Sequence, residues 1–276
     1  MDSVVGKARL IKTESARISE YLGTLSTDDW TTQSACESWQ VRDVVAHMTG
    51  AVDNFGSNIA RGAAGDASPP EGFPPAGQGD MSARLAANAR RAIDFRDSLG
   101  GDVLGAFNDR LVQFDDVLSH LTEADKDKPC YHAAGTISVE TYLNLRITEL
   151  IVHEWDIRSR LEPAAVLSPE SVPAILEMFP VFVVGRLFNP APRLSIRVRF
   201  RFDLTGPVSG SYDIVTGGGE KAIMEPAGEE QPQVTFGCDT QTFILLVYGR
   251  ITYEEAVGAK QITVSGDGSL AAQFGN

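Results

Sequence analysis

Residues 1–162 carry apolar side chains at the spacing of amphipathic helices. Between residues 4 and 25 they recur at every third or fourth position, as at Ala8, Ile11, Ile18 and Leu22, which predicts a helix with one buried face. The same spacing predicts four further helices, over 41–60, 81–99, 104–121 and 138–161. Gly and Pro crowd the segment 62–80, which predicts a long loop. The N-terminal part is therefore expected to be all helical.

After Pro163 the pattern changes from helical periodicity to strict alternation. One more helical stretch spans 169–187, and 194–202 then alternates apolar residues with Ser195 and three arginines. Alternation predicts a strand with one buried face, whose arginine face points to water or to a partner. Further short strands are expected over SGSYDIVTGGG, KAIMEPAG, PQVTFGC and QITVSG, and helices over TQTFILLVYG, TYEEAVGA and SLAAQF. The C-terminal part is therefore expected to be a smaller α+β domain.

Neither end of the chain nor its interior predicts a membrane segment. The N-terminus lacks the apolar core of a secretory signal. The longest apolar region, around 174–188, is interrupted by Glu177, Pro180 and Arg186, so it is too short and too broken to cross a bilayer. The length of 276 residues allows two modest domains or one large one. Because the sequence predicts neither a secretory signal nor a membrane-spanning helix, we expect a cytoplasmic protein.

The net charge and the cysteine content disfavour several classes of function. The formal net charge of −13 disfavours nucleic acid and anionic membrane surfaces as partners, because both require clustered Lys and Arg. Cys36, Cys130 and Cys238 are widely spaced and form no CxxC pair. This predicts a reducing compartment and no structural zinc site, with all three thiols serving in packing.

A polar stripe follows one face of the predicted helix 138–161. Its members stand three or four positions apart, at Arg146, Glu149, His153, Asp156 and Arg160. The stripe fits a solvated face held by ion pairs. It equally fits a metal site, because Glu149 and His153 project toward the same point and three protein ligands leave one coordination position open. Asp156 and Arg146, one turn away on either side, would then orient the ligands.

His47 is the candidate for the third ligand. It lies on the apolar face of the helix predicted over 41–60, and facing helices of a bundle commonly build metal sites from such side chains. A hydrogen-bonded core histidine is the alternative interpretation of the same position.

Two stretches resemble the signature segments of the mycothiol-dependent maleylpyruvate isomerase family. They are LSTDDWTTQSACESWQVRDVVAHMTGAVDNF and RITELIVHEWDIRSRL. This family belongs to the DinB-like metal-binding four-helix bundles. The resemblance implies that His47, Glu149 and His153 bind a divalent metal, usually zinc. The stretch VTFGCDTQTFILLVYGRITYEEAVGAKQITVSGDGSLAAQFG resembles the sterol-carrier-type domain that follows the bundle in the family.

The resemblance also implies a chemistry. The cofactor would be mycothiol, a low-molecular-weight thiol of actinobacteria, and the metal would hold it as thiolate, the nucleophilic form. Addition to a small electrophile with an activated cis double bond, rotation and elimination would give the trans isomer. No protein side chain need act as the nucleophile. An anionic substrate would need an arginine, for which Arg146, Arg84 and Arg250 are candidates.

The sequence thus predicts an α plus α+β protein. A DinB-like bundle is expected over 1–162, a helical connector over 163–190 and a sterol-carrier-type α+β domain over 191–276. The predicted function is a metal- and mycothiol-dependent isomerase acting on a small molecule. Two alternatives stay open: a mycothiol S-transferase in detoxification or biosynthesis, and a non-enzymatic protein that binds an apolar ligand.

Overall fold

The computed structural model describes residues 3–78, 81–180, 184 and 194–274. The chain divides into two compact units, Met1–Val166 and Leu167–Asn276. Much of the predicted connector over 163–190 and the end of the helix predicted over 169–187 lie outside the described residues. The described part of that helix is α7 (Val172–Glu177), which begins with Pro173 in its first turn, a position where the missing N–H of proline costs nothing.

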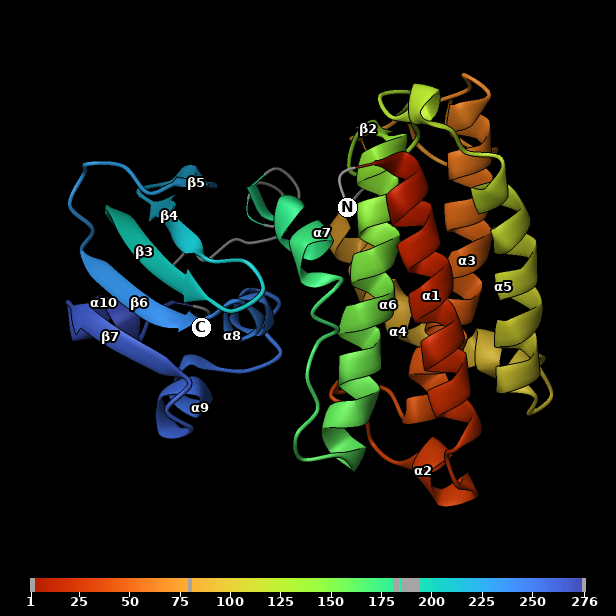
Figure 1. The fold of residues 1–276 in the computed structure, drawn as a ribbon, viewed down its shortest axis with the longest axis horizontal. Coiled ribbons are helices and arrows are strands. Elements are labelled where there is room, and N and C mark those ends of the chain that lie inside the picture. The colour runs from red at the N-terminus through yellow and green to blue at the C-terminus, as the bar shows by residue number, and fades with distance from the viewer. Residues whose placement is uncertain (1–2, 79–80, 181–183, 185–193, 275–276) are drawn as a thin grey trace. The chain divides into compact units, whose positions relative to one another are not determined.

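Four long helices of the first unit pack side by side as a bundle (Figure 1). They are α1 (Val4–Gly23), α3 (Val41–Ala63), α5 (Val103–Ser119) and α6 (Val139–Leu161), and α4 (Met81–Ser98) packs against α3. All five helices predicted from the spacing are present, with ends within three residues of the expected positions. The shorter elements are α2 (Thr27–Thr31), η1 (Glu123–Asp125) and the antiparallel pair β1 (Pro129–Cys130) and β2 (Ile137–Ser138).

Side-chain caps fix where the two central helices begin. The backbone N–H of Gln40 donates to Asp43 Oδ2 at 2.9 Å at the start of α3. The hydroxyl of Ser138 accepts from the N–H of Thr141 at 3.1 Å at the start of α6. Such bonds satisfy N–H groups that have no partner inside the helix. They therefore help to set which residues of α3 and α6 face each other farther along the bundle.

The interior of the bundle is apolar along most of its length. Its fully buried side chains come from all four long helices and include Ile11, Ile18, Leu22, Val44, Met48, Phe107, Leu143, Ile147 and Leu150. Burial of this apolar surface is the main term that stabilises the bundle.

The second unit contains a five-stranded sheet in the order β5-β4-β3-β6-β7. The strands are β3 (Arg197–Thr205), β4 (Gly210–Gly217), β5 (Glu220–Pro226), β6 (Val234–Asp239) and β7 (Ile262–Gly266). Only the β3–β6 pair in this sheet is parallel. The helices α8 (Thr240–Val247), α9 (Tyr253–Gly258) and α10 (Gly268–Ala271) complete the unit. The predicted α+β class is confirmed.

The arginine face of β3 differs from the expectation. Val198, Phe200 and Phe202 are buried as predicted, but Arg199 and Arg201 both donate to Asp213, a fully buried carboxylate on β4. These arginines are held in an internal ion-pair network and do not simply face water. Alternation along one strand identifies the buried face, but it cannot show which acids a neighbouring strand supplies.

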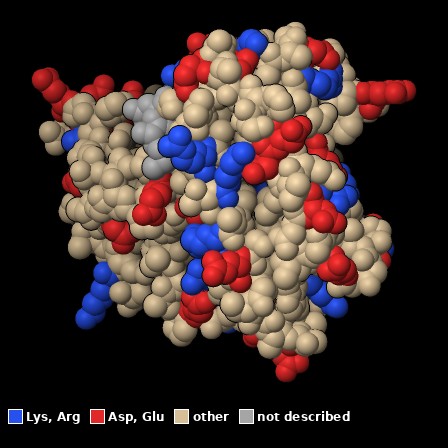
Figure 2. Space-filling model, turned by 45° about the vertical axis from the view of Figure 1, so that its right-hand side comes forward, with Lys and Arg blue, Asp and Glu red and all other residues tan. Residues whose placement is uncertain are grey.

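Charges on the surface are mixed. Figure 2 shows Lys and Arg side chains lying beside Asp and Glu on one face of the molecule, with broad uncharged areas between them. None of the described helices combines the length and the apolar character needed to cross a bilayer.

Candidate metal centre

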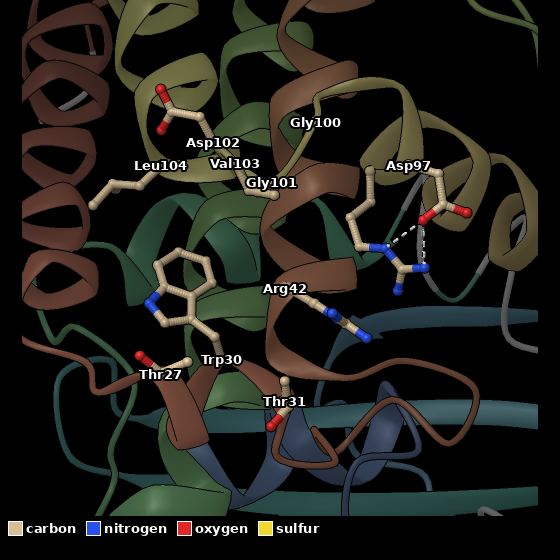
Figure 3. Close-up of a pocket in the computed structure, with 11 residues that line it drawn as sticks. Thr27, Trp30, Thr31, Arg42, Asp97, Gly100, Gly101, Asp102, Val103 and Leu104 are labelled. Carbon is tan, nitrogen blue, oxygen red and sulfur yellow. Dashed lines mark hydrogen bonds and ion pairs between the residues drawn. The ribbon is translucent and has the colours of Figure 1, made fainter.

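A pocket of about 570 Å³ in the first unit lies away from the predicted site residues. It is formed by α2, the first turn of α3, the end of α4 and the turn before α5, as Figure 3 shows around Trp30 and Arg42. Arg96 in its wall is paired with Asp43 and Asp97 at 2.5 and 2.7 Å. Sequence reasoning missed this pocket, because its walls come from four separate segments that share no motif. It holds none of the residues predicted to carry chemistry.

The three predicted metal ligands meet between two helices of the bundle. His47 on α3 places Nε2 at 2.6 Å from Oε1 of Glu149 on α6. Nε2 of His153 lies 3.5 Å from the same oxygen. One donor atom from each of the three residues lies within 4.8 Å of the other two. Their side chains are 11–23% exposed, so a small molecule can reach the cluster.

Helix geometry explains half of this convergence. Glu149 and His153 are four residues apart on α6, a spacing that puts two side chains on one face of a helix. His47 lies more than a hundred positions earlier in the chain. Its side chain reaches Glu149 and His153 because α3 packs against α6. Spacing alone could predict the pair, whereas the third member depended on the fold.

Asp156 orients His153. The ring Nδ1–H of His153 faces Oδ2 of Asp156 at 2.8 Å, and the Asp156 side chain is fully buried. A histidine that donates from Nδ1 to a carboxylate presents Nε2 to the other side, which is the usual support of a metal-ligating imidazole. Here Nε2 is directed toward Glu149. The structure therefore places Asp156 where the sequence predicted an orienting group.

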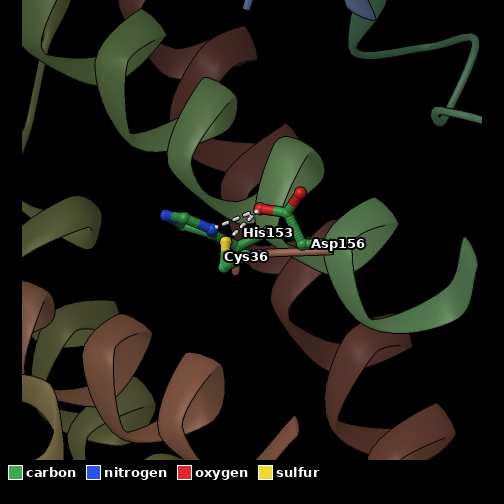
Figure 4. A group of neighbouring side chains, drawn as sticks. All are labelled: Cys36, His153 and Asp156. Atoms are coloured by element: carbon green, nitrogen blue, oxygen red, sulfur yellow. Dashed lines mark hydrogen bonds and ion pairs between the residues drawn. The ribbon is translucent and has the colours of Figure 1, made fainter. Parts of the chain in front are cut away.

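Cys36 takes part in the same network (Figure 4). Its thiol donates to Oδ2 of Asp156 at 3.1 Å, and the neighbouring N–H of Ala35 donates to the carbonyl of Asp156 at 2.8 Å. The expectation that all three cysteines serve only in packing is wrong for Cys36. No local pattern could have shown this contact, because the two residues are 120 positions apart.

The electrostatics of the cluster shift the pKa values of Glu149 and His153. Burial raises the pKa of Glu149, but His47 and His153 outweigh it and hold the pKa well below its ordinary value. Burial lowers the pKa of His153, but Glu149, Asp156 and Cys36 outweigh it and hold the pKa well above its usual range. A cation that binds Nε2 of His153 must replace a proton there, so its affinity falls as the pH falls.

Trp39 forms a wall of the cluster. Its ring lies 4.8 Å from that of His47 and 6.0 Å from that of His153, centroid to centroid. Its indole N–H donates to the carbonyl of Ala89 at 3.2 Å, and the residue is 7% exposed. Trp39 therefore packs beside both imidazoles while its indole N–H is held by the chain of α4.

Most of the polar stripe on α6 is not a solvated face, although its last member, Arg160, is exposed. Arg146 and Asp156 are 0% exposed and His153 is 9% exposed, because this face of α6 packs against the rest of the bundle. Arg146 points into the interior, 5.6 Å from the ring centroid of Phe55 and 5.8 Å from that of Phe114. It is therefore not at the exposed side of the cluster.

The other two predicted arginines are not placed at the cluster by the structure. Arg84 falls on α4, but its side chain is outside the described residues. Arg250 belongs to the second unit, in the turn between α8 and α9, where its Nη1 donates to the carbonyl of Tyr248 at 3.2 Å.

The family follows from a comparison with known proteins. Residues 11–158 match the model of the mycothiol maleylpyruvate isomerase N-terminal domain. The chain belongs to this family. The matched range contains His47, Glu149 and His153, and it includes most of both stretches from which the family was identified. A search of curated proteins found no match.

Solved structures extend the likeness of this maleylpyruvate isomerase family member to both units. The crystal structure of the mycothiol-dependent maleylpyruvate isomerase aligns with a TM-score of 0.58 at 16% identity, over 95% of this chain and 91% of that chain. A variant of that enzyme with one histidine changed to alanine gives the same values. At this identity the likeness shows the fold, and it confirms the predicted order of a helical bundle followed by an α+β domain. A sterol carrier protein domain 2 of Helicoverpa armigera aligns with a TM-score of 0.24 at 23% identity, over 29% of this chain and 64% of that chain.

Proposed function

We propose that this chain is a metal- and mycothiol-dependent isomerase of the maleylpyruvate isomerase type. His47, Glu149 and His153 are its metal ligands, zinc is the metal, and the substrate is a small electrophile. The observation that carries the proposal is the convergence of two imidazoles and one carboxylate within 4.8 Å in a member of this family. We also propose that the chain is divided into a bundle over 1–162, a connector over 163–190 and an α+β domain over 191–276. We propose a cytoplasmic location for the protein.

The residues fit a divalent ion by their chemistry. Two imidazole nitrogens and a carboxylate oxygen are a common donor set for zinc and other first-row divalent metals. Asp156 supports His153 from behind, at 2.8 Å, as the partners of metal-ligating histidines usually do. A bound ion of this type lowers the pKa of a thiol ligand and keeps it in the nucleophilic thiolate form.

Two of the protein's three cysteines are buried and are poor nucleophiles, which supports a thiol supplied by the cofactor. Burial raises the pKa of Cys130 to about 11. Burial, with a contribution from Asp239, raises the pKa of Cys238 to about 12. Cys36 is hydrogen-bonded to Asp156 and serves the orientation of His153. The side chains of the centre bind and orient, and none of them needs to form a bond to the substrate.

Isomerisation is favoured over stable thiol transfer by the fold. The structure that matches 95% of this chain is that of an isomerase. An isomerase returns the thiol unchanged, whereas an S-transferase consumes one thiol for each product. The consumption of mycothiol during turnover therefore separates the two reactions.

The experiment combines elemental analysis with an activity assay. Purified protein should contain one equivalent of zinc or another divalent metal, which His47→Ala loses. His120→Ala is the matched control, because His120 is 76% exposed at the end of α5, and it should keep the metal. Maleylpyruvate and related cis electrophiles should isomerise only when mycothiol is added, without net loss of thiol. Activity without any thiol, or unchanged metal content in His47→Ala, would overturn the proposal.

A further inference from the structure

A positively charged side chain lies inside the bundle, and no described carboxylate is bonded to it. Arg146 is 0% exposed, and its Nε and Nη2 have no hydrogen-bond partner among the described residues. Its Nη1 reaches only the carbonyl of Met48, at 3.5 Å, the outer limit of a hydrogen bond. Buried arginines are normally paired with a carboxylate. The described structure supplies none for Arg146.

The surroundings compensate this charge only in part. The faces of Phe55 and Phe114 attract a cation through their ring electrons, but a ring carries no net charge. Burial lowers the pKa of Arg146 to about 10, and the nearby charge of Glu149 opposes this change. The guanidinium is therefore still charged at neutral pH.

Arg146 lies behind the metal ligands on both helices. On α6 it precedes Glu149 by three residues, which is about one helical turn. Across the bundle it approaches the carbonyl of Met48, the residue that follows His47 on α3. Its charge therefore acts on the cluster through the protein interior, over a short path from which water is excluded.

The charges at the centre do not balance when a divalent ion is bound. Glu149 and Asp156 are the carboxylates of the cluster and its support, and together they neutralise two positive charges. The charge of Arg146 is then left over. An anionic ligand at the ion's open position would remove this excess.

We propose that Arg146 is a positioning residue that makes the centre select an anionic ligand, such as a thiolate or a carboxylate, over a neutral one. The inference rests on the proposed function, because it assumes a divalent ion held by His47, Glu149 and His153. Arg146 acts through its field and does not touch the ligand, since its side chain is not exposed. This replaces the direct contact with substrate that the sequence suggested for it.

Electrostatics gives the expected size and sign of the effect. An anion at the open position lies beyond the metal ligands, so we take its separation from the Arg146 charge as roughly 10 Å. At that separation, in an interior of effective dielectric constant near 20, a unit charge changes the affinity for an anion by roughly tenfold. The same charge repels a cation. Removal of Arg146 should therefore weaken anion binding and strengthen metal binding, two changes of opposite sign.

The experiment uses cobalt-loaded protein, with azide as the anionic probe and imidazole as the neutral probe, both followed by visible absorption. In Arg146→Met, azide should bind about tenfold more weakly, imidazole should be unchanged, and zinc affinity measured by chelator competition should rise. Arg110→Met is the matched control. Arg110 also lies over a ring, that of Phe95, but Asp53 neutralises it, so this variant should change none of the three affinities.

Two further variants distinguish the effect of the Arg146 charge from the effect of the shape of its side chain. Arg146→Lys keeps the charge and should keep the wild-type ratio of azide to imidazole affinity. Arg146→Gln removes the charge while keeping polar atoms, and it serves if the methionine variant does not fold. The wild-type ratio of azide to imidazole affinity is the reference, and both charge-removing variants should lower this ratio about tenfold.

Other results would overturn the inference in a recognisable way. A purely structural role would weaken azide, imidazole and zinc binding together in the charge-removing variants. An azide-to-imidazole affinity ratio in Arg146→Met equal to that of the wild type would also contradict it. Failure of the proposed function looks different, since the wild-type protein would then not bind cobalt at the His47 cluster.

Discussion

The carboxylate of Asp156 lies 2.8 Å from Nδ1 of His153 and is itself fully buried. This pair joins the candidate ligand set to the interior of the bundle. The strength of the metal centre should therefore depend on a residue that does not bind the metal.

Asp156→Asn tests this dependence. The variant keeps the size of the side chain but removes the charge that orients His153, and we expect metal affinity to fall roughly 10- to 100-fold. Competition with a coloured chelator measures it. Asp116→Asn, at a side chain that is 78% exposed on α5, should leave the affinity unchanged. Equal affinities of wild type and Asp156→Asn would mean that the contact is incidental.

Cys36→Ala tests the hydrogen bond between Cys36 and Asp156. The thiol of Cys36 donates to Asp156 at 3.1 Å, so its loss should lower metal affinity by less than Asp156→Asn does, about tenfold at most. Thiol-dependent turnover should persist in the variant. Cys238→Ala, in the second unit, should not change metal affinity. Complete loss of turnover with full metal content in Cys36→Ala would instead identify Cys36 as a nucleophile.

The Asp213 network of the second unit should make stability depend on acid pH. Burial raises the pKa of Asp213, but hydrogen bonds from Arg201 and Arg199 outweigh it and lower the pKa below its ordinary value. A carboxyl group with a lowered folded-state pKa contributes its full stability above the unfolded value, about 3.9. This contribution is lost as the pH falls below that value through the folded-state pKa.

Thermal unfolding from pH 7 to pH 3 measures this contribution. Asp213→Asn should be destabilised by about 3 kcal/mol at pH 7, because it leaves two partly buried arginines without their shared partner. The difference from wild type should shrink below about pH 4. Glu230→Gln changes a carboxylate that is 76% exposed and should have little effect at any pH. A difference for Asp213→Asn that does not vary with pH would contradict the assignment.

Gly62 should tolerate no side chain. A Cβ at this position of α3 would lie 2.2 Å from Sγ of Cys130 and 2.9 Å from the carbonyl oxygen of Pro129. Gly62→Ala should therefore destabilise the protein by about 1–3 kcal/mol, as overpacking does, although alanine favours helix. Adding Cys130→Ala should recover part of the loss. Gly23→Ala, which meets nothing within 4 Å, is the control for unfolding measurements.

Local periodicity predicted much of the fold, because the spacing of apolar side chains depends only on residues close together in the sequence. It located the five long helices of the first unit and the Glu149–His153 pair. The apolar helix face of His47 left two interpretations open, a third ligand or a core histidine, and the resemblance of sequence segments favoured the ligand. The position of Trp39 beside both imidazoles could not be derived from spacing, because it depends on how α3 and α6 pack.

Contacts between segments far apart in the chain could not be predicted from the sequence, and the reason is physical. The bond of Cys36 to Asp156 and the burial of Arg146 depend on packing between helices far apart in the chain. The acid that binds Arg199 and Arg201 comes from a neighbouring strand. In each case the residue type was visible in the sequence, but its partner was set by tertiary structure.

The segment that leads into α3 is fastened to α6 at two atoms of one residue. The N–H of Ala35 binds the carbonyl of Asp156, and the thiol of Cys36 binds its carboxylate. A change of length or sequence in this segment should therefore turn the His153 ring without altering any of the three candidate ligands. If a divalent ion binds them as proposed, this segment offers protein engineers a way to adjust which ion is preferred.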